Sequence, residues 1–331
     1  MNTKPNLLID RFGRKHTYLR ISVTDRCNLR CVYCMPAEGI KLKPKSELLN
    51  YEEIYRVASV FVKLGIEKIR ITGGEPLVRH DLELLLGKIS EIPGLKHIGM
   101  TTNAVLLAQK AEALKKAGLQ SVNISLDSLQ EEKFKEITLR DDFKRVLAGI
   151  DASEAVGFAP IKLNVVVMKG RNDHEVLDFV RYIKDRQINV RFIEYMPFKD
   201  NSWDLAAVHS YKDMKAQIET EFQLEPLAGL PSDVAKDFQI VGHQGKVSFI
   251  TSMTDSFCSS CNRLRMTADG SIKSCLFYDA EINMKDKLRS DCSDADIEEM
   301  ILYALANKPE EHPPMEELAM MSNRAMVEIG G

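Results

Sequence analysis

The sequence predicts an α/β fold: an incomplete (β/α)6 TIM-like barrel with a C-terminal domain that caps its open side. Short β-rich runs alternate with amphipathic helical segments through the first two thirds of the 331 residues. Gly65, Gly118 and Gly157 each follow a helical segment, as residues that end helices do. After about residue 200 the alternation stops, and polar stretches with Gly and Pro become frequent.

Six β-rich runs are expected to be parallel strands, because strands that alternate with helices form βαβ units. They cover residues 18–24, 66–72, 97–102, 120–126, 161–168 and 190–195. The amphipathic segments between them cover residues 51–64, 81–91, 106–117, 142–156 and 173–186. Six repeats fit a partial barrel better than a complete eightfold one. A doubly wound open sheet is the competing arrangement.

A domain boundary is expected near residue 225. Residues 1–225 would form the partial barrel, and residues 226–331 would form the C-terminal domain. The second part begins with polar loops, continues with the strand-like run KVSFIT and ends in two predicted helices.

The bulk composition is that of an ordinary globular protein. Hydrophobic residues make up 44%, charged residues 28%, and the formal net charge is −3, which gives no indication of nucleic acid as a partner. The sequence has no run of 18 apolar residues and no signal-peptide-like N-terminus, so no membrane segment is expected. We predict a cytoplasmic location, where cysteines serve as ligands or catalysts more often than in disulfides.

The first cysteine group follows directly on the first predicted strand. Cys27, Cys31 and Cys34 are spaced C-x3-C-x2-C. Three thiolates are one ligand short of a complete [4Fe–4S] site, and a missing ligand would leave one iron open for chemistry. A structural zinc site is the alternative, although no nearby His supplies a fourth ligand and the spacing is unusual for zinc.

The second cysteine group lies in the C-terminal part. Cys258, Cys261 and Cys275 are spaced C-x2-C-x13-C in the segment FCSSCNRLRMTADGSIKSCLF. Cys292 could complete an all-cysteine zinc site, but it lies in the polar run DCSD and is expected to have no ligand role. Two incomplete sites in one chain indicate chemistry more than storage of electrons.

The segment RISVTDRCNLRCVYCMPAEG resembles the radical S-adenosylmethionine (SAM) enzymes, in which an aromatic residue, here Tyr33, precedes the last cysteine. The resemblance implies a [4Fe–4S] cluster whose free iron chelates SAM and generates a 5′-deoxyadenosyl radical. It also implies SAM contacts at the ends of later strands, by Gly74 of GGEP, Ser125 of SLD and Met196. In isolation these residues would be read as a turn, a helix N-cap and a core side chain.

The second group and its flanking residues resemble the GTP 3′,8-cyclases, which perform the first step of molybdenum cofactor synthesis. The resemblance runs from about residue 11 to the end and includes RITGGEPL, TTN, SLDS, KLNVVVMKG, RFIEYMP and the closing GG. It implies a second [4Fe–4S] cluster with an open iron that faces the purine of GTP. The deoxyadenosyl radical would remove the ribose C3′ hydrogen, and the C3′ radical would attack guanine C8 to give 3′,8-cyclo-7,8-dihydro-GTP.

No side chain is expected to be a catalytic residue itself. The same resemblance implies that GTP is contacted by Arg20, Arg70, Thr101, Lys162, Arg263 and Arg265. Arginine suits a triphosphate through its planar fork of donors, although a single Arg or Lys is usually a solvated surface charge. On strands between apolar neighbours, a buried charge needs a partner. The tail Gly330-Gly331 would enter the active site and complete it. Without the resemblance it would be read as a frayed terminus, as most chain ends are.

An external one-electron reductant and a homodimer are further implications of the resemblance. One departure is Ala104, which occupies a position where glycine is common and would be strained at positive φ. His16, His80 and His97 are expected at the surface or in turns, without a ligand role. Two alternatives stay open: a radical SAM peptide-modifying enzyme with an auxiliary cluster, and a non-enzymatic electron-transfer or zinc-stabilised interaction module.

Overall fold

The structure, a computed structural model, describes residues 7–199, 201–229, 232–255, 257–280, 282–321 and 324–330. Within these ranges the strands form one sheet in the order β12-β11-β10-β1-β2-β3-β4-β5-β6-β9-β8-β7. Its first six strands along the chain confirm the six predicted ones: β1 Tyr18–Ser22, β2 Lys68–Thr72, β3 His97–Thr102, β4 Ser121–Ser125, β5 Ile161–Val167 and β6 Ile188–Glu194. They pair in parallel in sequence order.

The C-terminal third extends this sheet at both ends. β9 (Lys246–Ile250) pairs in parallel with β6, and β10 (Arg263–Met266) pairs in parallel with β1. The outermost strands are antiparallel: β7 Leu224–Pro226 and β8 Ala235–Ile240 on one side, and β11 Ser271–Lys273 and β12 Ile282–Asn283 on the other. The segment that joins β9 to β10 therefore leads from one end of the parallel run to the other.

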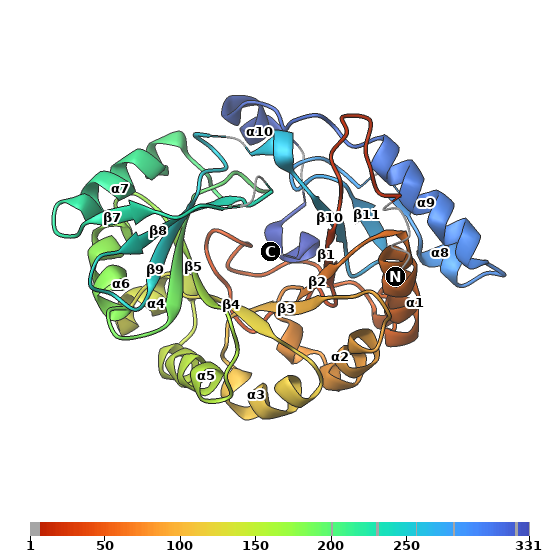
Figure 1. The fold of residues 1–331 in the computed structure, drawn as a ribbon, viewed down its shortest axis with the longest axis horizontal. Coiled ribbons are helices and arrows are strands. Elements are labelled where there is room, and N and C mark those ends of the chain that lie inside the picture. The colour runs from red at the N-terminus through yellow and green to blue at the C-terminus, as the bar shows by residue number, and fades with distance from the viewer. Residues whose placement is uncertain are drawn as a thin grey trace.

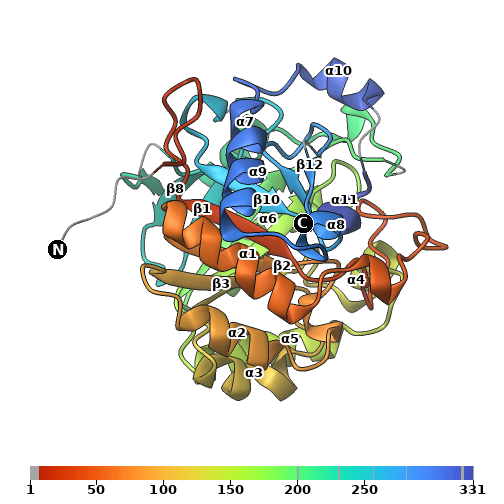
Figure 2. The same ribbon diagram turned by 90° about the vertical axis from the view of Figure 1, so that its right-hand side faces the viewer.

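The sheet curves into an open arc and does not close into a barrel (Figure 1). Helices lie along the outside of the arc, and the described C-terminus lies inside it (Figure 1). A doubly wound sheet would carry helices on both faces, so the partial barrel is confirmed. Helix α10 (Met315–Met320) lies on the opposite side of the molecule from α2 (Leu82–Ser90) and α3 (Leu107–Lys116), as Figures 1 and 2 both show.

The helices that cover the arc follow the predicted segments closely. They are α1 Tyr51–Leu64, α2, α3, α5 Phe143–Ala155 and α6 Val176–Tyr182, and later parts of the chain add α7 Tyr211–Glu219, α8 Lys285–Leu288 and α9 Asp294–Ala306. The short helix α11 (Met326–Ile329) lies inside the arc with the C-terminus. α1 begins at a capping box, in which Asn50 and Glu53 bond each other's backbone N–H groups, and ends at Gly65 with φ +119°. Gly118 and Gly157 also have positive φ, at +97° and +72°, as expected of helix-ending glycines.

Among the described residues up to 225, two helices were absent from the sequence-based assignment: α7, which lies where loops were expected, and α4. α4 (Glu131–Thr138) is a short helix with the sequence EEKFKEIT, too brief and too charged to give a clear apolar period. It buries Phe134 in the main core and Ile137 in a smaller cluster with Met168 and Tyr195. Its last turn matters for the site described below.

The core lies between the sheet and the outer helices. Ile54 and Phe61 of α1, spaced so that both face inward, are fully buried, and so is Ile71 of β2. Burying each such side chain contributes about 1.5–3 kcal/mol. Among the described residues, no helix has the length and apolar character needed to cross a membrane.

Candidate active site

A cavity opens at the carboxyl ends of the central strands, where barrel folds place their chemistry. It holds about 1400 Å³ of space, part of it open to solvent. The first cysteine group and all four predicted SAM contacts line it: Cys27, Cys31, Cys34, Tyr33, Gly74, Ser125 and Met196. We call it the main cavity.

The cysteine loop is held by the end of α4. The backbone N–H groups of Arg30 and Val32 each donate to a carbonyl in the last turn of that helix, at 2.9 Å. The Tyr33 hydroxyl donates to Asp127 Oδ2 at 2.8 Å, and Asp127 Oδ1 accepts from the N–H of Val166 at 2.8 Å. These bonds anchor the loop on either side of Cys31.

Glycine at position 74 allows the loop that follows β2 to approach the cysteine loop. Its N–H donates to the carbonyl of Thr24 at 2.8 Å. A Cβ at this position would lie 2.5 Å from the carbonyl oxygen of Arg26 and 2.9 Å from Val327, so no other residue fits without displacing backbone. The neighbouring Glu75 is fully buried, and burial raises its pKa to about 7.

Parallel pairing brings three predicted GTP contacts side by side. Arg20 on β1 lies opposite Arg265 on β10 and opposite Arg70 on β2. The next residue in this row is Gly99 on β3, where a Cβ would lie 2.9 Å from Arg70 Nη2. Glycine there makes room for the guanidinium of Arg70. A second row places Thr101, Asn123 and Lys162 on β3, β4 and β5.

Arg70 is buried, and the neighbouring cations Arg20, Arg265 and Lys162 are half-buried. Burial and neighbouring positive charge lower the pKa of Arg20 to about 10, that of Arg265 to about 9 and that of Lys162 to about 8. Burial opposes ionisation of Tyr18, yet the surrounding cations outweigh it and lower its pKa to about 7. A site in which cations disfavour one another and favour an anionic tyrosine is suited to a polyanionic ligand.

Several buried polar atoms around these rows have no hydrogen-bond partner among the described residues. They are Arg20 Nε, Arg191 Nε, Arg265 Nη1, Thr101 Oγ1, Asn123 Oδ1 and Asn164 Oδ1. Buried polar groups are nearly always satisfied in a complete structure, and each one left unpaired costs about 1–3 kcal/mol. Because all six residues line the main cavity, a polar ligand there would satisfy them.

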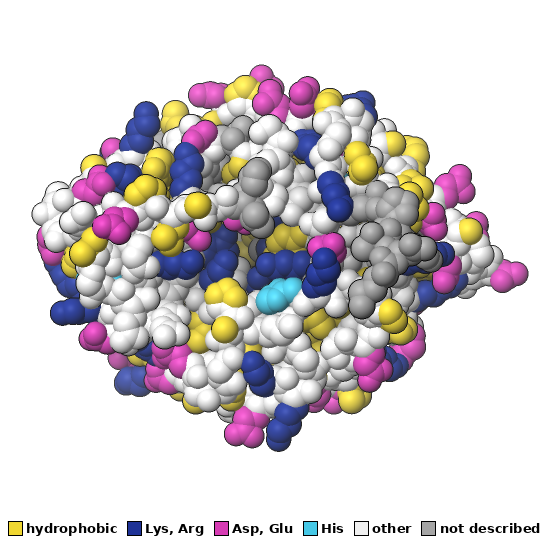
Figure 3. All heavy atoms as spheres, viewed as in Figure 1, with side chains coloured by type: hydrophobic (Ala, Val, Ile, Leu, Met, Phe, Trp, Pro, Cys, Tyr) yellow, Lys and Arg dark blue, Asp and Glu magenta, His cyan; other side chains and the backbone are white. Residues whose placement is uncertain are grey.

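A second, basic cavity lies at the amino ends of the same strands. It is lined by Arg70, Lys162, Lys68, Tyr18 and His97, with Glu67, Asp233 and Asp237 among its acidic residues. Arg20, Arg191 and Arg263 line both cavities, so the two spaces adjoin. Figure 3 shows Lys and Arg side chains gathered around the hollow in the middle of this face. Of the predicted GTP contacts, Arg20, Thr101, Arg263 and Arg265 line the main cavity, and Arg70 and Lys162 line the basic one.

The second cysteine group begins in the segment between β9 and β10. Its three sulfurs are half-buried, and the flanking residues Phe257 and Leu276 line the main cavity, whereas the cysteines themselves do not. Arg263 Nη2 lies 3.9 Å from Cys261 Sγ. Burial opposes ionisation of Cys261, but Arg263 and Lys308 outweigh it and lower the pKa of this thiol to about 7.

Of the six predicted ligands, Cys261 alone has a lowered pKa, and burial raises the pKa of the other five. Burial raises the pKa of Cys27 to about 11 and that of Cys31 well above its ordinary value, with Glu75 and Asp127 adding to the effect. Bound irons would hold these thiols deprotonated, since metals bind the thiolate form.

The cysteine sulfurs do not converge on a point. Among the described residues, no group of three His, Cys, Asp or Glu side chains is close enough to share one metal ion. A tetrahedral zinc ion would need sulfurs that all lie about 2.3 Å from a single centre. A cluster, in which each cysteine binds a different iron, fits three separated sulfurs in either group.

The C-terminal tail enters the mouth of the arc. The carbonyl of Gly330 accepts a hydrogen bond from Arg20 Nη2 at 3.5 Å, and φ of Gly330 is +75°. A Cβ at this position would lie 2.5 Å from Thr72 Oγ1 and 2.8 Å from Ser22 Cβ. Val327 lines the main cavity. Gly331 lies outside the described residues.

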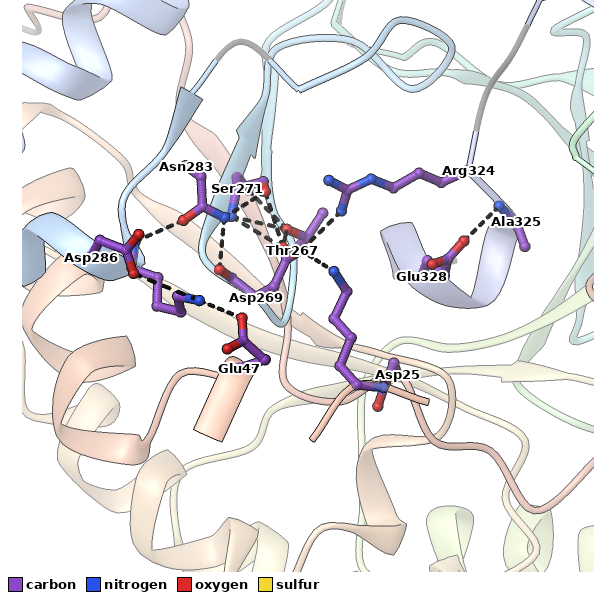
Figure 4. A network of polar contacts seen from close by, with 12 residues as sticks. Asp25, Glu47, Thr267, Asp269, Ser271, Asn283, Asp286, Arg324, Ala325 and Glu328 are labelled. Carbon is purple, nitrogen blue, oxygen red and sulfur yellow. Dashed lines mark hydrogen bonds and ion pairs between the residues drawn. The ribbon is translucent and has the colours of Figure 1, made fainter. Parts of the chain in front are cut away.

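An ion-pair node holds the start of this tail (Figure 4). Asp269 Oδ2 lies 2.7 Å from Lys43 Nζ and 3.3 Å from Arg324 Nη1, and Ser271 Oγ donates to Oδ1 at 3.0 Å. Burial disfavours the charged form of Asp269, but bonds from Lys43 and Thr267 outweigh it and hold the pKa of this carboxyl well below its usual range. The node joins the loop after the first cysteine group to the segment before Gly330.

The structure corrects one sequence-based expectation, for His16, and adds detail for Ala104 and Cys292. His16 was expected at the surface or in a turn but is fully buried beside the Asp10–Arg14 ion pair. Ala104 has a φ of +62°, so the backbone strain expected for alanine at positive φ is present and costs about 1–2 kcal/mol. Cys292 is buried in the core and donates to the carbonyl of Ser293 at 3.3 Å.

Several residues of the site were not assigned from the sequence. Among them, Lys68, Arg191 and Lys308 carry no local signal. Lys68 and Arg191 reach the cavities only through the strand pairing. Lys308 reaches Cys261 from 47 residues farther along the chain.

Comparisons with known proteins agree with this arrangement. The profile described as "Radical SAM superfamily" matches residues 21–183, and that described as "Molybdenum Cofactor Synthesis C" matches residues 188–314. The chain is 47% identical to "GTP 3′,8-cyclase, mitochondrial" of Arabidopsis thaliana, covering 100% of this chain and 85% of that protein. It is 46% identical to "GTP 3′,8-cyclase" of Listeria monocytogenes, covering 98% and 99%. "Molybdenum cofactor biosynthesis protein 1" of Mus musculus is 48% identical, and this chain covers 51% of it, about half its length.

Solved structures show the same fold at low identity. SuiB of Streptococcus suis, bound to S-adenosylmethionine, superposes with a TM-score of 0.60 at 15% identity, over 95% of this chain and 77% of that one. The anSMEcpe structure with bound AdoMet gives 0.56 at 17%, over 85% and 78%. These likenesses establish the fold alone. The full-length matches to the curated relatives establish the family: the chain belongs to the radical SAM superfamily and, within it, to the family of the GTP 3′,8-cyclases.

Proposed function

We propose that this chain is a GTP 3′,8-cyclase that catalyses the first step of molybdenum cofactor biosynthesis. Its cofactors are two [4Fe–4S] clusters and SAM. When bound, they supply a 5′-deoxyadenosyl radical, which takes the C3′ hydrogen of GTP so that C3′ bonds to guanine C8. The chain's own residues bind the two ligands, orient them and exclude water.

The observation that carries the proposal is the pair of adjoining cavities with Arg20, Arg191 and Arg263 at their junction. One cavity contains the first cysteine group, and the other contains buried cations. A triphosphate would neutralise those cations and bond to donors that are now unpaired. A nucleoside triphosphate placed across the junction would therefore bring its ribose and base toward the cysteine loop.

Each predicted contact has a role that suits its position. Tyr33, Gly74, Ser125 and Met196 lie around the first cysteine group and would hold SAM there. Arg70 and Lys162 would bind the phosphates, whereas Arg265 and Thr101 would orient the ribose or base nearer the radical. Gly330, with Gly331 beyond it, would narrow the entrance and keep water from quenching an alkyl radical.

The test is an anaerobic incubation with GTP, SAM and dithionite. The wild-type protein should contain roughly eight irons per chain and give 5′-deoxyadenosine together with the cyclised GTP. Cys258→Ala should still cleave SAM but should not cyclise GTP, since it loses a ligand of the second cluster alone. SAM cleavage with unchanged GTP in the wild-type protein would sink the substrate assignment, and zinc in place of iron would sink the chemistry.

Four further proposals concern the reductant, the oligomeric state, the domain division and the location of the protein. We propose that an external one-electron reductant and a homodimer accompany the activity, as the family resemblance implies. The division at residue 225 and the cytoplasmic location are likewise proposals, which rest on the composition change and on the reduced cysteines. The peptide-modifying alternative is not favoured, because the curated relatives that match the full chain at 46–48% identity are GTP cyclases and molybdenum cofactor proteins.

A further inference from the structure

Lys308 is a buried lysine next to the second cysteine group. Only 2% of its surface is exposed, and it follows α9, in a segment separate from all three cysteines. Its ammonium lies 3.6 Å from Cys261 Sγ and donates to the carbonyl of Arg263 at 3.2 Å and to the carbonyl of Ser274. An ammonium has three donors, so these three acceptors use all of them.

The three acceptors come from the two separate pieces of the second cysteine group. Cys261 and Arg263 belong to the first piece, while Ser274 immediately precedes Cys275 in the second. The long spacing between Cys261 and Cys275 leaves the relative position of the two pieces undetermined by local sequence. One ammonium bonded to both pieces sets that position.

Arg14 anchors the same segment from its other side. It donates to the carbonyl of Cys258 at 2.8 Å and to the carbonyls of Pro309 and Glu310, and it pairs with Asp10 at 2.6 Å. The segment that carries Lys308 is therefore fixed directly behind the cysteines. Arg14 has a carboxylate partner, whereas among the described residues Lys308 has no Asp or Glu within ion-pair distance.

A buried cation without a carboxylate requires another anion, because an unpaired buried charge is strongly unfavourable. The nearest candidate is the thiolate of Cys261 and the cluster it would hold. The first cysteine group differs in this respect. Arg30 Nη1 donates to the carbonyls of Cys27 and Leu29, and Cys27 Sγ accepts from two neutral groups, the N–H of Leu29 at 3.4 Å and the side-chain amide of Asn103 at 3.8 Å.

We infer that Lys308 is the positioning residue of the second cluster, which holds Cys261 and Cys275 in register and raises the reduction potential of that cluster by an ammonium hydrogen bond to a ligating sulfur. Hydrogen bonds to the sulfurs and nearby charge are among the factors that set cluster potentials. A positive charge favours the reduced state, which carries one more electron. The inference rests on the second cluster of the proposed function.

The experiment is an anaerobic redox titration of the full-length, reconstituted protein, followed by electron paramagnetic resonance. A background with Cys27, Cys31 and Cys34 replaced by Ala isolates the signal of the second cluster. Lys308→Met removes the charge and the donors, Lys308→Gln removes the charge but keeps two N–H donors, and Lys308→Arg keeps the charge. Lys285→Met is the matched control, because Lys285 lies in the same part of the chain but pairs with Glu47 at the surface.

We expect Lys308→Met to lower the reduction equilibrium constant of the second cluster about tenfold, a shift of about 59 mV for a one-electron couple. Lys308→Gln should shift it in the same direction, while Lys308→Arg and Lys285→Met should keep close to the wild-type potential. Loss of about four irons in Lys308→Met, with SAM cleavage retained when the first group is intact, would also support the positioning role.

A Lys308→Met or Lys308→Gln protein that keeps its iron and titrates at the wild-type potential overturns the inference. If Lys308→Met loses both iron and SAM cleavage, the protein has unfolded, and Lys308→Gln against Lys308→Arg then decides the matter. A wild-type background protein that binds no second cluster would instead contradict the proposed function, so the two failures are distinct.

Discussion

Replacing Gly330 by Ala tests whether the tail acts from the position seen in the structure. The φ of Gly330 is +75°, where an alanine costs about 1–2 kcal/mol. That strain alone would reduce the docked population of the tail roughly 5- to 30-fold. The new methyl carbon would also lie 2.5 Å from Oγ1 of the buried Thr72 and 2.8 Å from Ser22 Cβ. We therefore expect the tail to leave the pocket.

The assay compares GTP cyclisation with thermal unfolding. Gly330→Ala should lose at least about tenfold in cyclisation, with little change in Tm, because the strained segment is at the chain end. Gly157→Ala is the matched control: its φ is +72°, no atom lies within 4 Å of the added Cβ, and it is at the end of α5. It should keep full activity and show only the stability change. Wild-type cyclisation by Gly330→Ala would refute the claim that the tail must occupy this pocket for activity.

Three further predictions follow from the charges of the site. Lys162→Met should weaken GTP binding by about 1.5–3 kcal/mol, roughly 10- to 100-fold, through loss of a charge-assisted bond, and unchanged affinity by calorimetry would contradict its role. Asp269→Asn should increase hydrogen–deuterium exchange in residues 324–330 and lower the free energy of unfolding by about 1–2 kcal/mol. This loss is smaller than for a fully buried ion pair, because the side chains of Lys43 and Arg324 are about a third exposed. Unchanged exchange would show that the node does not hold the tail. Burial, reinforced by Lys308, lowers the pKa of His16 to about 4, from 6.5 in the unfolded chain. The unfolded state thus binds more protons between these values, so stability should fall as pH drops from 6.5 to 4, by up to about 3 kcal/mol, and His16→Gln should flatten this slope in urea titrations.

The local part of the fold was readable from the sequence. The six strands and most of the outer helices were predicted because each has its own period and end signals, such as Asn50 and Gly65 around α1. α4 was missed because a helix of eight residues, mostly charged, has little apolar periodicity. Its carbonyls nevertheless hold the cysteine loop, so a short element with a weak signal has a large effect on the site.

The pairing of distant segments could not be predicted from the sequence. Arg20 and Arg265 are adjacent only because β10 joins the edge of β1, a contact between residues more than 240 positions apart. No local pattern encodes that register, and the same is true of β9 beside β6. The family resemblance identified the arginines one by one, whereas the structure explains why they gather in one row.

The electrostatic character of the site also depended on the fold. Arginine and lysine are solvated in most sequences, and their burial here follows from inward-facing positions on neighbouring strands. The partner of a buried group can be far away in sequence, as Lys308 is from Cys261. Such pairs become visible only when the chain has been folded around them.

The most direct test of the central claim uses GTP that carries deuterium at C3′. If radical chemistry at the junction of the two cavities takes the C3′ hydrogen, the 5′-deoxyadenosine released under anaerobic conditions should contain one deuterium, alongside cyclised GTP. Unlabelled 5′-deoxyadenosine formed together with the cyclised product would contradict hydrogen abstraction from C3′ and, with it, the placement of the ribose beside the first cysteine group.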